Sequence, residues 1–280
     1  MTQAETIAGG APKATASGSK AVPKVELRDI GLRYYTRAGE IEALRSVSID
    51  IAPGEFVSIV GPSGCGKSTL LSLIAGILKA TSGSVLIDGS PVNGPSKSCG
   101  YMLQHDHLFG WRSILDNVLL GPEIQGADME AAREYGRQLL GRYGLAEFVD
   151  LHPHQLSGGM RQRVALARTL CTKPEVLLLD EPFSALDYQT RLAISDEIGL
   201  ILREEGKTVI LVTHDISEAI SMTDRVIVLG RRPGHVKSEH HIAFPSVSGG
   251  RPSPFAARSA PEFGSYFKVI WDELDVHVAT

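Results

Sequence analysis

Residues 55–78 read EFVSIVGPSGCGKSTLLSLIAGIL, and this stretch decides the fold. It begins with an apolar, β-rich run, continues with a loop of glycine and serine, and ends in an apolar pattern with helical spacing. The loop, residues 61–69, matches the pattern G-x-x-x-x-G-K-[ST]. A strand, such a loop and a helix in this order predict a phosphate-binding loop.

The residue types of this loop suit a nucleotide triphosphate and Mg²⁺. Glycines let successive backbone N–H groups turn toward phosphate oxygens, and the following helix adds the positive end of its dipole. We expect Lys67 to neutralise the β- and γ-phosphates, Ser68 to coordinate Mg²⁺ and Thr69 to contact the α-phosphate. The whole set of expected phosphate-binding residues is Gly61, Pro62, Ser63, Gly64, Cys65, Gly66, Lys67, Ser68 and Thr69. Cys65 lies near a lysine and a helix N-terminus, which should favour its thiolate, so bound ATP should protect it from alkylation.

The rest of the chain predicts an α/β fold. Three helices, expected at 158–171, 188–205 and 216–222, precede the apolar runs EVLLLD, KTVILV and RVIVLG. This alternation predicts a mostly parallel sheet with helices on both faces. The alternating runs of residues 25–51 predict antiparallel edge strands, and GSVLIDG (83–89) predicts another short strand.

Three segments interrupt or extend this core of residues 25–240. Residues 105–157 have helical periodicity and are expected to form an inserted helical subdomain, with Asp128 as an N-cap. Residues 1–24 are rich in Ala, Gly, Ser and Thr and predict a disordered tail. Residues 241–280 form a short extension with a strand and one or two helices.

Composition narrows the class of protein. The chain has 280 residues, 43% of them hydrophobic, which is enough for a substantial core. A net charge of -4 leaves no basic surplus for binding nucleic acid. Three cysteines without CxxC spacing indicate a reducing, cytosolic compartment. No apolar run reaches the length of a membrane-spanning helix.

Polar residues follow the expected strands where open α/β sheets bind ligands. Asp180 can hold Mg²⁺ and Glu181 can polarise the attacking water, unless the pair is only an acidic turn. His214 could reach the γ-phosphate, although a structural histidine is an equal alternative. Gln104 could sense both the metal and the attacking water. Tyr34, or less favourably Tyr35, could stack on adenine or simply pack in its strand.

Two further motifs carry a resemblance to a known family. With LSGGM at 156–160 and SALD at 184–187, the chain resembles the nucleotide-binding subunit of an ATP-binding cassette (ABC) transporter. The resemblance implies a RecA-like P-loop core and a head-to-tail homodimer with two ATP molecules at the interface. Ser157, Gly158 and Gly159 would then contact the ATP of the other subunit, and Asp187 would link the two sites. Side chains at the two glycines would block a phosphate, whereas bare backbone N–H groups can receive it.

The segment QHDHLFGWRSILDNVLLGPEIQG (104–126) is similar to the nitrate/sulfonate/taurine importer group, although Gly110 replaces a proline usual there. That resemblance implies separate permease subunits, a periplasmic or lipid-anchored solute-binding protein, and a place on the cytoplasmic face of the bacterial inner membrane. An ABC ATPase in a non-transport process is the alternative. A permease helix would dock on Leu108, Phe109, Trp111, Ile114 and Val118, unless these residues form the helical core. The HDH (105–107) and HPH (152–154) sequences lack zinc-like spacing, so we expect solvated turns there.

Overall fold

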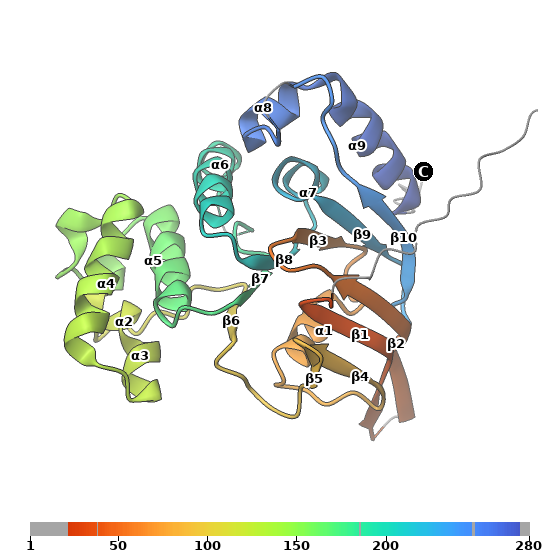
Figure 1. Cartoon of the computed structure of the whole chain (residues 1–280), viewed down its shortest axis with the longest axis horizontal. Coiled ribbons are helices and arrows are strands. Elements are labelled where there is room, and N and C mark those ends of the chain that lie inside the picture. Colours follow the sequence, from red (N-terminus) through yellow and green to blue (C-terminus); the bar gives the residue numbers. More distant parts are fainter. Residues whose placement is uncertain (1–21, 38, 185, 248–249, 275–280) are drawn as a thin grey trace, which may run out of the picture.

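The computed structural model describes residues 22–37, 39–184, 186–247 and 250–274. The expected disordered tail lies outside these ranges except for its last three residues. A six-stranded sheet in the order β10-β9-β3-β8-β7-β6 is the centre of the fold (Figure 1). Its strands are β3 (Phe56–Val60), β6 (Cys99–Met102), β7 (Val176–Asp180), β8 (Thr208–Val212), β9 (Arg225–Leu229) and β10 (Val236–His241). All neighbouring pairs are parallel except β9 and β10, so the expected mostly parallel sheet is confirmed.

Helices cover both faces of this sheet. In β7, Leu177 and Leu179 belong to the hydrophobic cluster that includes α5 and α6, whereas Val176 and Leu178 belong to the cluster that includes α1. Because successive strand residues point to opposite faces, a strand between two helical layers is apolar throughout, as β7 is. The helices are α1 (Lys67–Ile74), α5 (Gly158–Cys171), α6 (Tyr188–Glu204) and α7 (Ile216–Met222). The three helices predicted at 158–171, 188–205 and 216–222 are therefore present, the second ending one residue early.

A second, antiparallel sheet lies beside α1 (Figure 1). Its order is β2 (Gly39–Ile51), β1 (Val25–Thr36), β4 (Ser82–Ile87) and β5 (Ser90–Pro91). The predicted antiparallel edge strands and the short strand at GSVLIDG are thereby confirmed. Apolar residues of this sheet, such as Leu44 and Val47, share one core with α1 and with the face of the central sheet that α1 covers.

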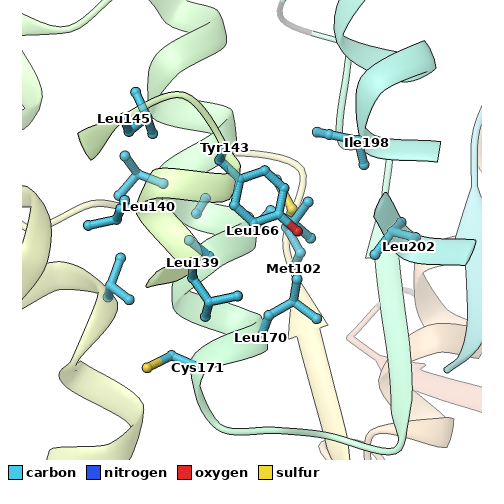
Figure 2. Close-up of a cluster of buried hydrophobic side chains, with 14 of the residues drawn as sticks. Met102, Leu139, Leu140, Tyr143, Leu145, Leu166, Leu170, Cys171, Ile198 and Leu202 are labelled. Carbon is cyan, nitrogen blue, oxygen red and sulfur yellow. The ribbon is translucent and has the colours of Figure 1, made fainter. Parts of the chain in front are cut away.

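The helical subdomain packs against α5, away from the antiparallel sheet (Figure 1). Its helices are α2 (Ile114–Val118), α3 (Leu120–Gln125), α4 (Met129–Arg142) and the short η1 (Ala146–Phe148) and η2 (Pro153–Gln155). Asp128 caps α4, as predicted, by accepting hydrogen bonds from the backbone N–H groups of Glu130 and Ala131. Figure 2 shows Leu139, Leu140 and Tyr143 meeting the α5 side chains in a buried cluster.

The C-terminal segment returns to the central sheet. After β10 come α8 (Pro254–Ser259) and α9 (Pro261–Glu273), which pack on α7. Arg251 fixes the connection, because its guanidinium donates to the carbonyls of Ile242 and Ile220 and lies over the ring of Phe244. None of the described helices is long and apolar enough to cross a membrane.

Candidate functional site

The loop between β3 and α1 forms a phosphate-sized cradle. Gly66 has φ +106°, a conformation that favours glycine, and a Cβ there would lie 2.7 Å from Leu44 Cδ2. The Lys67 ammonium folds over the loop and donates to the carbonyls of Gly61 (2.7 Å) and Pro62 (3.1 Å). A pocket of about 230 Å³ opens beside the loop. It is lined by Tyr34, Ala43, Ser63, Gly64, Gly66, Lys67, Ser68, Thr69, Glu181 and Arg232.

Three expected loop residues, Gly61, Pro62 and Cys65, are not among those that line this pocket. Cys65 is 1% exposed, its side chain packs in the core below the loop, and burial raises the pKa of its thiol although Lys67 is near. The prediction of a favoured thiolate was wrong, because desolvation outweighs the attraction of one lysine. Cys65 is therefore a buried packing residue beneath the loop.

Asp180 ends β7 beside the first turn of α1. Its Oδ1 accepts a hydrogen bond from Ser68 Oγ at 3.0 Å, and its Oδ2 accepts one from the Tyr101 hydroxyl at 3.3 Å. Burial raises the pKa of the Asp180 carboxyl, and burial also raises the pKa of Tyr101 to about 12. The Ser68 hydroxyl and the buried Asp180 carboxylate lie side by side, and both are hard oxygen ligands of the type that Mg²⁺ selects. The two predicted metal ligands, Ser68 and Asp180, therefore fit the ion.

Tyr101 was missed by the sequence analysis. It lies on β6, whose parallel pairing with β7 places Tyr101 opposite Leu178, two residues before Asp180. In the sequence, the only sign of a role for Tyr101 is its position three residues before Gln104. That sign points to Asp180 only once the pairing of β6 with β7 is known.

Glu181, Gln104 and His214 come from three neighbouring strand ends and meet at one carboxylate oxygen. Glu181 Oε2 lies 3.1 Å from Gln104 Nε2, which donates to it, and 3.2 Å from His214 Nδ1. The Glu181 backbone has φ +45°, and its N–H donates to the carbonyl of Val212 on β8. A left-handed backbone costs a non-glycine residue of order 1–3 kcal/mol, and such residues cluster at functional sites. The strain therefore marks Glu181 as a residue held in place. In the described structure, Gln104 is hydrogen-bonded to Glu181 and not to the two expected metal ligands, Ser68 and Asp180.

The expected trans residues lie at the start of α5. Ser157 is the N-cap and accepts from the Met160 N–H at 3.3 Å. In the described part of the chain, no hydrogen bond or ion pair joins residues 157–159 to the loop at 61–69. The two glycines differ: Gly158 has room for a Cβ, whereas a Cβ on Gly159 would lie 2.4 Å from Ile194 Cδ1 of α6. The Cβ position of Gly159 thus faces its own subunit's core, and contact of either glycine's backbone N–H with a phosphate of the other subunit remains a prediction.

The remaining expected ligand residues are placed as follows. Tyr34 lines the pocket, whereas Tyr35 does not line it and is 75% exposed, so the geometry favours Tyr34 for adenine. Asp187 caps α6 by accepting from the Thr190 N–H, and that hydrogen bond lowers the pKa of its carboxyl. No hydrogen bond or ion pair within the described residues connects Asp187 to Lys67 or the other expected ligands of its own subunit.

The sequence predicts a solvated turn at HDH (105–107), but the structure shows that this turn is bonded to α5. Asp106 Oδ2 accepts from Arg161 Nε at 3.0 Å, and the same arginine donates to the carbonyl of Leu156, next to Ser157. Arg168 donates to the carbonyls of Asp106 and His107. The turn after Gln104 is therefore tied to the helix that carries residues 157–159. Among the described residues there is no cluster of histidine, cysteine or carboxylate side chains that could hold a metal.

The five residues expected at a permease groove separate into two groups. Phe109 and Trp111 stack with ring centroids 4.8 Å apart, and Trp111 is 76% exposed. Ile114 and Val118 are fully buried, so the expectation was wrong for these two. Leu108 is partly buried against the same core, and its place in a groove stays a prediction. Helix α2 turns its apolar side toward α4 and α5, which leaves only the preceding loop to present aromatic rings.

The fold and site define a P-loop ATPase with an antiparallel sheet and a helical insertion. The family model described as ABC transporter matches residues 44–184. This chain belongs to the ATP-binding proteins of the ABC transporters, a family that hydrolyses ATP.

Relatives and solved structures agree with that assignment. An uncharacterized ABC transporter ATP-binding protein of Bacillus subtilis, YtlC, is 45% identical over 242 residues, which are 86% of this chain and 92% of the relative. The taurine import ATP-binding protein TauB of Roseobacter denitrificans is 38% identical over 253 residues, covering 89% and 94% of the two chains. A dimeric post-hydrolysis structure of the ATP-binding cassette MJ0796, bound to ADP and Pi, has a TM-score of 0.69 and 36% identity, covering 78% of this chain and 99% of that one.

Proposed function

We propose that this chain energises an importer by binding and hydrolysing ATP on the loop at 61–69. The convergence of Gln104 and His214 on one oxygen of Glu181 carries the proposal. Such a geometry orients a carboxylate at the edge of a pocket that also holds Lys67 and Ser68. Because a general base must be fixed near the proton it abstracts, this arrangement supports Glu181 as the base.

In the proposed reaction, Glu181 takes a proton from a water that attacks the γ-phosphorus. A new oxygen–phosphorus bond forms, the bond to the β,γ-bridging oxygen breaks, and ADP and phosphate leave. Gln104 and His214 hold the Glu181 carboxylate and line the path of the water, while Lys67 neutralises phosphate charge. Mg²⁺, held by Ser68 and Asp180, would neutralise charge on the β- and γ-oxygens when bound.

We further propose that two copies share each ATP. Ser157 and the bare backbone at Gly158 and Gly159 would receive the phosphates held by the partner copy, with Asp187 at the same interface. The dimeric MJ0796 cassette supports this arrangement, since it is similar to this chain over 78% of its length. The helix start is suited to the task because its first N–H groups and its dipole both attract anions.

The importer assignment rests on relatives and on one exposed surface. Taurine import proteins are similar to this chain along most of its length. Trp111, which stacks on Phe109, lines a pocket of about 420 Å³ together with Arg112, Asp116 and Arg133. An exposed tryptophan among polar side chains suits a helix of a permease subunit. We propose that the chain docks there on the cytoplasmic side of the bacterial inner membrane, in a system with a solute-binding protein for taurine or a similar small solute.

Purification of the tagged chain from detergent-solubilised membranes of its own host tests this proposal. A polytopic permease should co-elute in a defined ratio, and Trp111→Asp should reduce its recovery at least about tenfold through loss of a buried aromatic contact. The ATPase rate of the isolated Trp111→Asp chain should stay at the parental value. Equal recovery of a permease with both forms would refute docking at Trp111, and no permease with either form would favour the non-transport alternative.

A further inference from the structure

The loop between β9 and β10 is fastened to the nucleotide loop. The Gly234 N–H donates to the Ala43 carbonyl, and its own carbonyl accepts from the Arg45 N–H, each at 2.9 Å. A Cβ on Gly234 would lie 2.0 Å from the Cys65 carbonyl oxygen, so only glycine allows this approach. The sequence GRRPG at 230–234 is therefore held against the backbone of the phosphate cradle.

Arg232 projects from this loop into the pocket. It lines the same space as Tyr34, Lys67 and Glu181, and a Cβ built on Gly64 would lie 4.0 Å from Arg232 Nη2. Its side chain is exposed, and it makes no hydrogen bond or ion pair with any residue in the described ranges. The Arg232 guanidinium is thus a cation beside the cradle that has no partner within the described ranges, carried by a loop whose backbone is held in place at Gly234.

The charges that line the pocket indicate which ligand Arg232 binds. The Lys67 ammonium is the other cation that lines the pocket, whereas a nucleotide triphosphate carries several negative charges. A guanidinium offers five N–H donors in a planar fork that matches phosphate oxygens in pairs. An arginine without a carboxylate partner, next to a glycine-rich loop, is suited to bind a phosphate group of the nucleotide and not its neutral adenine ring.

We propose that Arg232 contacts the β- or γ-phosphate of bound ATP, an inference that rests on the proposed ATP site at 61–69. It is a ligand-binding residue supplied by the β9–β10 loop, and it distinguishes di- and triphosphates from monophosphates. Gly234 and the two hydrogen bonds around it position the arginine.

Equilibrium binding of Mg-ATP, Mg-ADP and AMP to Arg232→Ala and Arg232→Lys tests the proposal. Arg232→Ala should weaken Mg-ATP binding about tenfold or more, as expected for a charge-assisted hydrogen bond, and AMP binding less than about twofold. Arg232→Lys should recover part of the loss, because it restores the charge without the fork. Arg231→Ala is the matched control, since Arg231 is the neighbouring arginine and does not line the pocket.

Several results would overturn the inference. Unchanged Mg-ATP affinity in Arg232→Ala, or an equal loss of affinity for ATP, ADP and AMP, would show that the side chain does not contact the β- or γ-phosphate. A similar loss in Arg231→Ala would assign the effect to general surface charge. If the parental chain itself does not bind Mg-ATP, the proposed ATP site fails, and Arg232 fails with it.

Discussion

The two glycines that begin α5 should respond in opposite ways to alanine. A Cβ on Gly158 would meet its nearest neighbour, Leu186 Cδ2, at 3.6 Å, an ordinary contact. A Cβ on Gly159 would lie 2.4 Å from Ile194 Cδ1 and 3.4 Å from Thr190 Cγ2, both on α6. The first position is open in the single subunit, whereas the second is closed by its own subunit's core.

These contacts set the magnitudes. Alanine at a compatible helical glycine stabilises by about 0.4–1 kcal/mol, because the unfolded chain loses freedom. At Gly159 the gain is offset by overpacking against buried Ile194, which typically costs about 1–3 kcal/mol. Gly158→Ala should thus be at least as stable as the parent, and Gly159→Ala should lose about 0.5–2 kcal/mol, the difference of the two terms.

Urea unfolding and steady-state ATPase assays on the same samples separate packing from function. Gly158→Ala should lose ~10²-fold in ATPase rate while folding normally, since a misplacement of about 1 Å at the reacting phosphate is that costly. Parental ATPase activity in Gly158→Ala would refute the account of a phosphate received at this helix start. Equal stability of the two alanine variants would refute the packing role of Gly159.

Two further predictions concern buried polar groups. Tyr143 is fully buried and its hydroxyl has no hydrogen-bond partner in the described structure. Tyr143→Phe should therefore raise the urea-unfolding free energy by about 1–3 kcal/mol, and a loss would show that the hydroxyl is satisfied. Burial raises the pKa of Glu218 to about 7, while its unfolded value is near 4.5. The folded state holds this proton longer than the unfolded chain, so parental stability should fall relative to Glu218→Gln as pH rises from 4.5 to 7. Parallel pH profiles of the two proteins would contradict this.

Contiguous patterns made much of the site predictable. The loop at 61–69 can be recognised from the sequence because the strand, loop and helix that build it are adjacent in the chain. Asp180 and Glu181 could be placed because a buried strand ending in two carboxylates delivers them to the ligand edge of a parallel sheet. In the structure Glu181 does lie at this edge, with Gln104 and His214 on either side.

Features that depend on contacts between distant segments were not predictable. Tyr101 reaches Asp180 only because β6 pairs with β7, and Arg232 reaches the pocket only because Gly234 packs on the Cys65 backbone. The burial of Cys65 and the closed surroundings of Gly159 follow from packing. A sequence pattern gives the residue type a site needs, but it does not show which neighbour fills the space around it.

The central claim is that two copies of this chain close around ATP, and the mass of the Glu181→Gln variant in solution tests it most directly. Without the base, ATP should bind and stay unhydrolysed. Light scattering after size exclusion should show a monomer in Mg-ADP and a stable dimer in Mg-ATP, with twice the 30.1 kDa mass of one chain. A Glu181→Gln variant that binds Mg-ATP and remains a monomer, or one that hydrolyses ATP at the parental rate, would contradict the account.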